Sequence, residues 1–196
     1  MIPSLDPKVR TWACAPREEI TAFRAEALHG PQRLSKLPVG ELKRYAEALP
    51  AHEWATALEP ASAYAWSNKG NALDGLKRYD EALAAYDEGL SLDPNDAGSW
   101  NNKGDTLTPM GRYDDAMQVV DRALALDQNE AVSWTTKGEI LNDLARFAEA
   151  LPYLASASAL DMQTLDAWKA RAVALRGPGR EAEAAEAERR AQELGG

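Results

Sequence analysis

The sequence predicts an all-α solenoid of antiparallel helix pairs, and three observations lead to this fold class. Helix-forming residues (Ala, Leu, Glu and Arg) dominate the 196-residue chain, whereas β-branched residues are scarce. Four of the six tryptophans recur at a constant spacing of 34 residues. Small and large apolar residues keep fixed offsets around each of them, as a stacked helical repeat requires. The four tryptophans are Trp66, Trp100, Trp134 and Trp168.

Residues 1–62 are predicted to form a divergent helical cap or a degenerate repeat. Residues 42–60 match residues 76–94 at ten of nineteen positions, so residues 41–60 are expected to form the second helix of an earlier repeat. Prolines and a glycine lie in the segment where the first helix of that repeat is expected, so a regular helix cannot form there. A better helix is predicted at residues 16–29. Two interpretations of that segment stay open, namely the displaced partner of 41–60 and a separate capping helix.

Four repeat units are predicted to follow, at residues 63–96, 97–130, 131–164 and 165–196. In each first helix, a Trp, a Gly or Ala four residues later and a Leu three residues beyond share one face. The Trp and Leu are predicted to be core residues, and alanines on the second helix let the two axes approach closely. A short breaker such as 76–79 separates the helices. Acidic residues open the second helix, and Asp93–Asp96 offers a cap for the next unit.

The motif Trp66-x2-Lys69-Gly70-x2-Leu73, followed by Ala82-x3-Tyr86 and Pro94, resembles the tetratricopeptide-repeat consensus. The resemblance covers residues 63–196 in four copies. It implies a right-handed α-α superhelix in which the first helix of each unit lines a concave groove. It also implies a non-enzymatic scaffold that binds extended peptides or helices in that groove.

The chain departs from the family pattern at several positions. Pro109 is predicted to end the first helix of the second copy early, and Pro152 to perturb the second helix of the third. Basic residues stand where the family usually has Leu, and their stems can cover apolar surface while the charge reaches water. They are Lys69, Lys103, Lys137 and Arg171.

The concave face that the resemblance implies is polar and rich in amides. Asn side chains can hydrogen-bond a peptide backbone, and carboxylates favour Lys or Arg on a ligand. Lys169 and Arg176 make the last unit locally basic, so a ligand that is acidic at one end fits there. The predicted peptide-binding residues are Tyr64, Asn68, Asn71, Asp74, Asn101, Asn102, Asp105, Thr136, Glu139 and Asp143.

One branch of the family holds a terminal carboxylate with a Lys/Asn/Asn/Lys/Arg clamp. Asn71 and Asn102 occupy the two Asn places, but the cationic places hold residues such as Ser67 and Thr136. Without cations the carboxylate loses its charge-assisted partners, so no such clamp is expected.

The charge of the chain restricts its partners. The net charge is −9, and all of it lies in residues 61–196, which carry 14 Lys and Arg against 23 Asp and Glu. Such a field repels nucleic acid and anionic membranes, so a basic or neutral protein or peptide is the expected partner. No apolar run is long enough for a secretory signal or a membrane span, and a cytoplasmic location is expected.

No arrangement of residues in the sequence predicts catalysis or metal binding. Cys14 is the single cysteine, and His29 and His52 have no second ligand at metal-binding spacing, so they are expected to be exposed helix-end residues. The stretch Arg176–Arg180 is interpreted as a turn and not as a phosphate nest. No catalytic residue, cofactor or metal is therefore predicted.

The predicted function is a non-enzymatic adaptor that binds a polypeptide segment in its concave groove. Two alternatives remain: a self-associating structural protein, which leaves a homo-oligomer open, and a small secretion-type chaperone. The polar groove does not favour the chaperone. At the C-terminal end, Glu181 and Glu188 replace the aromatic residues of the repeat, as is typical of a polar terminal cap.

Overall fold

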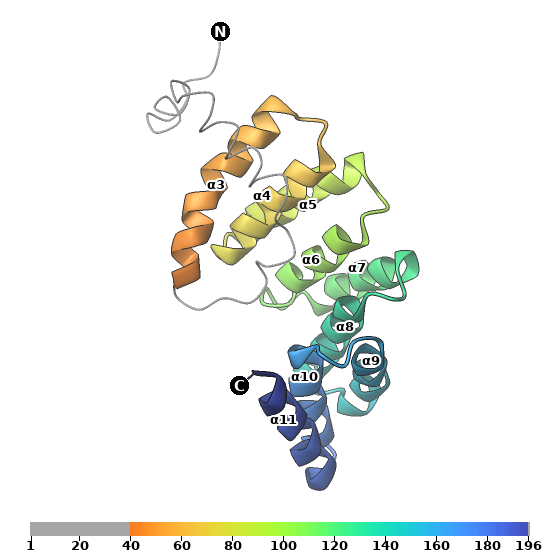
Figure 1. Ribbon diagram of the computed structural model, residues 1–196. Helices are drawn as coiled ribbons and strands as arrows, with labels where there is room; N and C mark the ends of the chain where they lie inside the picture. Colours follow the sequence, from red (N-terminus) through yellow and green to blue (C-terminus); the bar gives the residue numbers. More distant parts are fainter. Residues whose placement is uncertain (1–39, 196) are drawn as a thin grey trace. The chain divides into compact units, whose positions relative to one another are not determined.

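The computed structural model describes residues 40–195 and shows them as successive helices joined by short turns (Figure 1). The chain divides into two compact units, Met1–Leu92 and Asp93–Gly196, and each unit is described by itself below. All regular structure in the described residues is helical, which confirms the predicted all-α class. The candidate helix at residues 16–29, Cys14 and His29 lie outside the described residues.

The described part of the first unit contains three helices. Residues 41–60, predicted to form a second repeat helix, correspond to α3 (Gly40–Leu58), which continues through Pro50. Helix α3 packs against α4 (Ala63–Gly75), and α4 packs against α5 (Tyr79–Leu92). Their shared core contains Leu49, Leu73 and Tyr86.

The second unit consists of six helices in three pairs. Helix α6 packs on α7, α8 on α9, and α10 on α11. The first helices also contact one another, α6 with α8 and α8 with α10, so the three form a continuous wall. The bounds are α6 Ala97–Leu107, α7 Tyr113–Leu126, α8 Ala131–Asp143, α9 Phe147–Leu160, α10 Leu165–Arg176 and α11 Glu181–Gly195.

The small residue four positions after each Trp allows the close approach of paired helices. A Cβ atom on Gly70 would lie 2.5 Å from the Tyr86 ring. A Cβ atom on Gly138 would collide with the side chain of Leu154, which is fully buried. At these points a small residue of the first helix therefore faces a large residue of the second, which brings the two helix axes close together.

The turn within each helix pair has the same backbone conformation in all four copies. Residues 77, 111, 145 and 179 adopt positive φ angles of 59°, 72°, 55° and 78°. The following residue donates its backbone N–H to the carbonyl of the Leu five positions earlier, as in Arg78 to Leu73 at 2.9 Å and Arg146 to Leu141 at 2.8 Å. This is the Schellman arrangement, which satisfies the last carbonyls of a helix.

An arginine precedes every second helix of the four pairs and binds an acidic residue three positions later. The predicted acidic first turns are confirmed, and each acts as an arginine partner: Arg78–Glu81, Arg112–Asp115, Arg146–Glu149 and Arg180–Glu183, at 2.6–2.7 Å. Hydrogen bonds from Arg146 lower the pKa of Glu149 below its ordinary value, and Arg180 does the same for Glu183.

The prediction that the periodic tryptophans are core residues is wrong in part. All four are half-buried, and each indole Nε1–H donates to the carbonyl six residues earlier in the turn between units. The distances are 2.9 Å for Trp66 to Pro60 and 3.1 Å for Trp168 to Met162. An indole N–H needs a hydrogen-bond acceptor, so the ring packs at the edge of the core and its N–H stabilises the turn between units.

The two prolines have different effects. Helix α6 ends at Leu107, two residues short of the corresponding ends of α4 and α8, as Pro109 predicted. Helix α9 continues through Pro152, so the predicted perturbation does not interrupt it. Pro152 is exposed, and the neighbouring Leu154 remains fully buried in the core.

Three of the four basic residues that replace Leu lie over the Trp of their own copy: Lys69, Lys103 and Arg171, at 5.0, 5.6 and 5.3 Å from the ring centroid. Lys137 differs from the expectation that its charge reaches water. It is buried, lies 4.5 Å over the Tyr153 ring, and pairs with Asp121.

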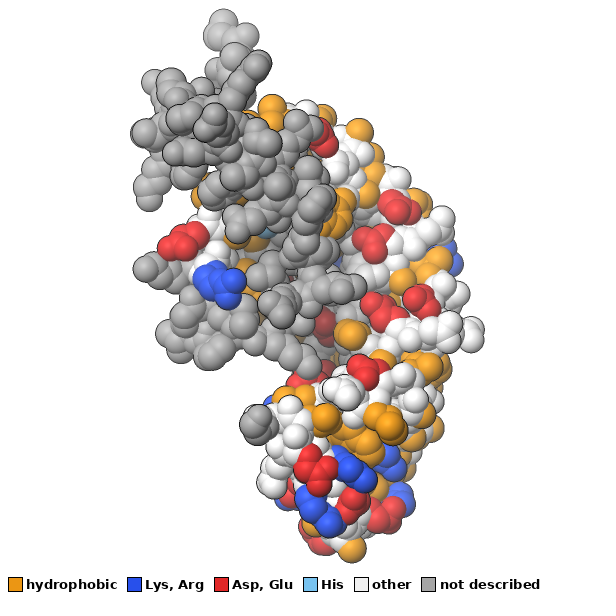
Figure 2. All heavy atoms as spheres, viewed as in Figure 1, with side chains coloured by type: hydrophobic (Ala, Val, Ile, Leu, Met, Phe, Trp, Pro, Cys, Tyr) orange, Lys and Arg blue, Asp and Glu red, His pale blue; other side chains and the backbone are white. Residues whose placement is uncertain are grey.

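The last helix buries one stripe of alanines, Ala184, Ala187 and Ala191, and exposes charged residues elsewhere. Acidic and basic side chains alternate over it in Figure 2. Arg190 lies within 4 Å of both Glu186 and Glu193, so these charges compensate one another locally.

Candidate functional site

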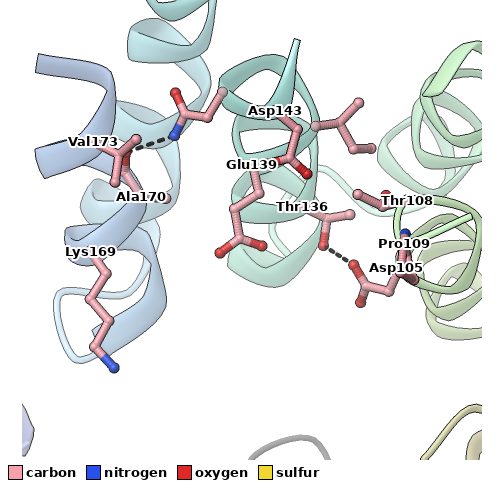
Figure 3. Close-up of a pocket in the computed structure, with 11 residues that line it drawn as sticks. Asp105, Thr108, Pro109, Thr136, Glu139, Asp143, Lys169, Ala170 and Val173 are labelled. Carbon is pink, nitrogen blue, oxygen red and sulfur yellow. Dashed lines mark hydrogen bonds between the residues drawn. The ribbon is translucent and has the colours of Figure 1, made fainter. Parts of the chain in front are cut away.

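An open pocket of about 470 Å³ lies in the second unit, along the wall formed by the first helices. Figure 3 shows its labelled side chains coming from α6 and the turn after it, from α8, and from α10. The lining residues are Asp105, Thr108, Pro109, Thr136, Glu139, Ile140, Asn142, Asp143, Lys169, Ala170 and Val173.

The α6–α8 side of the pocket is acidic. Glu139 and Asp143 are exposed one turn apart on α8, and Asp105 is exposed on α6. Both oxygens of the Asp105 carboxylate accept hydrogen bonds: Thr136 Oγ1 donates to one at 2.9 Å, and Asn101 Nδ2 to the other at 3.2 Å. The Thr136 bond links α8 to α6, so Asp105 is held in place while still facing the pocket (Figure 3).

The α10 side combines an ammonium group with apolar surface. Lys169 is exposed, and Val173, one turn later, is 49% exposed although it is aliphatic. Ala170 lies between them and is buried. The floor is completed by Ile140, which is fully buried.

Asn142 connects the acidic and the basic side. Its Nδ2 donates to the Ala170 carbonyl at 2.8 Å, which ties α8 to α10 beside the pocket. Its Oδ1 is buried and has no hydrogen-bond partner among residues 40–195. The Nδ2 bond holds the amide across α8 and α10 at the edge of the pocket.

The helix repeat explains why these side chains meet. Asp105, Glu139 and Val173 each stand five residues after the Trp of their unit, and therefore recur on the same face of adjacent first helices. Pro109 and Asp143 share a second such position, nine residues after the Trp. Because Pro109 ends α6 early, its ring lines the pocket at a repeat position where α4 and α8 are still helical.

Four of the ten predicted site residues are brought together in this pocket: Asp105, Thr136, Glu139 and Asp143. Asn101 supports Asp105 from a buried position, with 2% of its surface exposed. Asn102 is half-buried on α6 and does not line the pocket. Thr136 lines it with only 4% of its surface exposed.

The other four predicted residues, Tyr64, Asn68, Asn71 and Asp74, lie on α4 in the first unit. Asn68 is buried, and Asn71 Oδ1 accepts a 2.7 Å hydrogen bond from the Tyr86 hydroxyl. Both amides therefore belong in part to the packing of α4.

The sequence does not indicate Pro109 and Ile140 as lining residues. Pro109 is predicted only to end a helix, although it occupies the same repeat position as Asp143. Ile140 adjoins Glu139 but is buried, so the periodicity of exposed polar residues does not indicate it.

His52 is also placed differently from the expectation of an exposed helix end. It is buried within α3, and burial lowers the pKa of its imidazole below the ordinary value of 6.5. Within residues 40–195, no cluster of three His, Cys, Asp or Glu side chains is arranged to hold a metal ion.

None of the helices in residues 40–195 combines the length and the apolar character that crossing a bilayer requires.

Family models described as tetratricopeptide repeat match residues 63–96, 85–118 and 135–196. No curated protein matches the chain. Among solved structures, MamA 41-end from Desulfovibrio magneticus RS-1 is 18% identical, covers 97% of each chain, and has a TM-score of 0.67.

Two further solved structures are similar. A crystal structure of MamA is 17% identical over 81% of this chain and 95% of that chain, with a TM-score of 0.65. YrrB, described as "a TPR protein with an unusual peptide-binding site", is 20% identical over 80% of each chain, with a TM-score of 0.59. At these identities the likeness establishes the fold.

Proposed function

Because the chain belongs to the tetratricopeptide-repeat family, we propose that it is a non-enzymatic scaffold that binds a polypeptide segment in the pocket of its second unit. The observation that carries the proposal is the convergence of Asp105, Glu139 and Asp143 on one open pocket with an apolar floor. The three carboxylates come from two adjacent first helices that pack directly against each other.

A polypeptide suits this pocket better than a small molecule does. The pocket is open and lies along the wall of α6, α8 and α10, so an extended segment can cross several helices. The exposed aliphatic surface of Val173 offers a contact for an apolar side chain. The peptide-binding site of the structurally similar YrrB supports the same class of ligand.

The charge of the pocket favours a basic residue on the ligand. Carboxylates that converge on one place attract a Lys or Arg side chain and repel an acidic one. The excess of acidic residues in residues 61–196 adds a long-range attraction in the same direction.

The proposal is tested by selecting binders from a displayed library of random peptides on the full chain and measuring their affinities. The informative variant combines Glu139→Lys with Asp143→Lys. Asp105 is left unchanged because it accepts hydrogen bonds from Thr136 and Asn101, which its replacement would break. This reversal is expected to weaken the binding of basic peptides by about 1–3 kcal/mol.

A matched control reverses two exposed acidic residues outside the pocket, Asp114→Lys with Glu181→Lys. Both double variants change the net charge by the same amount, so a general charge effect would weaken both equally. Peptides that bind the pocket variant and the control variant with the same affinity would refute the proposed site.

A further inference from the structure

The two sides of the pocket carry opposite charge. Glu139 and Asp143 present carboxylates from α8, and Lys169 presents an ammonium group from α10. Figure 3 shows these residues on separate helices around one opening, with Ala170 and Val173 on the same helix as Lys169. A ligand that crosses from α8 to α10 therefore contacts carboxylates on α8 and both an apolar surface and an ammonium group on α10.

Lys169 differs from the other basic residues of the three pocket helices. It is exposed, and it is the one basic side chain of α6, α8 and α10 with neither an aromatic ring nor a carboxylate as partner. The others are Lys103 and Arg171, which lie over tryptophans, Lys137, which pairs with Asp121, and Arg176, which pairs with Glu188.

The residues at the repeat position of Lys169, one after the Trp, are buried in the three earlier copies. These residues are Ser67, Asn101 and Thr135, with 8%, 2% and 4% of their surface exposed. In the fourth copy the same position is exposed at the pocket and carries a charge. Asp143 is likewise exposed, and within the described residues it has no ion pair or hydrogen bond.

We propose that the pocket selects a segment with charges of both signs, in which a basic side chain binds the α6–α8 side and a carboxylate binds Lys169. An apolar residue between them would lie on Val173. Because the two charges bind different helices, the order of the basic and acidic residues in a given segment determines the direction in which it crosses the pocket, and Lys169 binds its acidic end. This inference rests on the proposed function and deepens it.

A displayed library of random 12-residue peptides is selected separately on the wild-type protein, on the Lys169→Glu variant and on the Arg122→Glu variant. The peptides that bind each protein are then sequenced. Arg122 is exposed on α7 outside the pocket, so its variant matches the change of net charge. Wild-type and Arg122→Glu pools should enrich a basic and an acidic residue at a fixed offset. The Lys169→Glu pool should keep the basic preference and lose the acidic one.

Affinities of one selected peptide provide the second measurement. Lys169→Glu should weaken its binding by about 2- to 5-fold, the range of one exposed ion pair. A peptide whose acidic residue is replaced by Lys should regain affinity on Lys169→Glu alone. Exchanging the basic and acidic residues should weaken binding to the wild type.

The outcomes separate the two proposals. If wild-type pools enrich basic residues alone, or if Lys169→Glu binds the selected peptide as Arg122→Glu does, the role of Lys169 is refuted and the scaffold function stands. If no peptide binds the wild type more tightly than the Glu139→Lys/Asp143→Lys variant, the proposed function itself fails.

Discussion

At the scale of single residues, the least expected feature is a left-handed backbone at two residues that carry side chains. Lys77 and Ala145 stand at the same turn position as Gly111 and Gly179, and all four have positive φ. A Cβ atom is unfavourable in this conformation, whereas glycine adopts it readily. The native chain therefore carries backbone strain in two of the four turns within its described helix pairs.

Ala145→Gly is expected to raise the free energy of unfolding by about 0.5–1 kcal/mol, because relief of the strain exceeds the added freedom of the unfolded chain. Gly111→Ala should lower it by a similar amount, since its new Cβ atom would contact nothing within 4 Å and only the backbone would respond. Urea unfolding followed by circular dichroism measures both changes. A less stable Ala145→Gly variant would contradict the account of these turns.

At the scale of helix pairs, close approach is the property that the repeat preserves. Gly138 faces the fully buried Leu154 across the α8–α9 contact, with no room for a methyl group. Gly138→Ala is therefore expected to lower the free energy of unfolding by about 1–3 kcal/mol through overpacking.

Gly98→Ala is the matched control for this helix contact. A Cβ atom there would meet only Asp96 Oδ1, at 3.4 Å, so the better helix propensity of Ala should leave stability unchanged or raised. Thermal unfolding of the two variants distinguishes these cases, and an unaffected Gly138→Ala variant would mean that the helices are not held at this distance.

Much of the helix arrangement was predictable from the sequence, because apolar spacing determines which faces must be buried. The 34-residue period identified the helix pairs, and the presence of Pro109 predicted the early end of α6. Two features were not predictable from the spacing alone. The indole N–H of each Trp needs a carbonyl, which places the ring at the edge of the core, and Pro152 is accommodated within α9.

The candidate site was predictable only in part, for a related reason. A periodic pattern identifies outward positions, and so it identified Asp105, Glu139 and Asp143. It does not show which outward amides are used in packing. Asn101 is buried against Asp105, and Asn71 binds Tyr86. Such cross-helix partners depend on side-chain geometry that one sequence does not contain.

At the scale of the whole molecule, the chain combines a stack of helix pairs with an excess of acidic charge. Apolar side chains meet between helices, and most arginines of the second unit are paired with carboxylates. The carboxylates and the ammonium group at the pocket remain at the surface. The central claim is therefore that binding takes place on the wall of α6, α8 and α10.

Backbone amide NMR of the labelled chain, titrated with one library-selected peptide, tests this claim most directly. The account predicts that the largest chemical-shift changes occur at Asp105, Glu139 and Val173 and at their neighbours on the three first helices. Changes confined to α7, α9 and α11, or to the helices of the first unit, would contradict it.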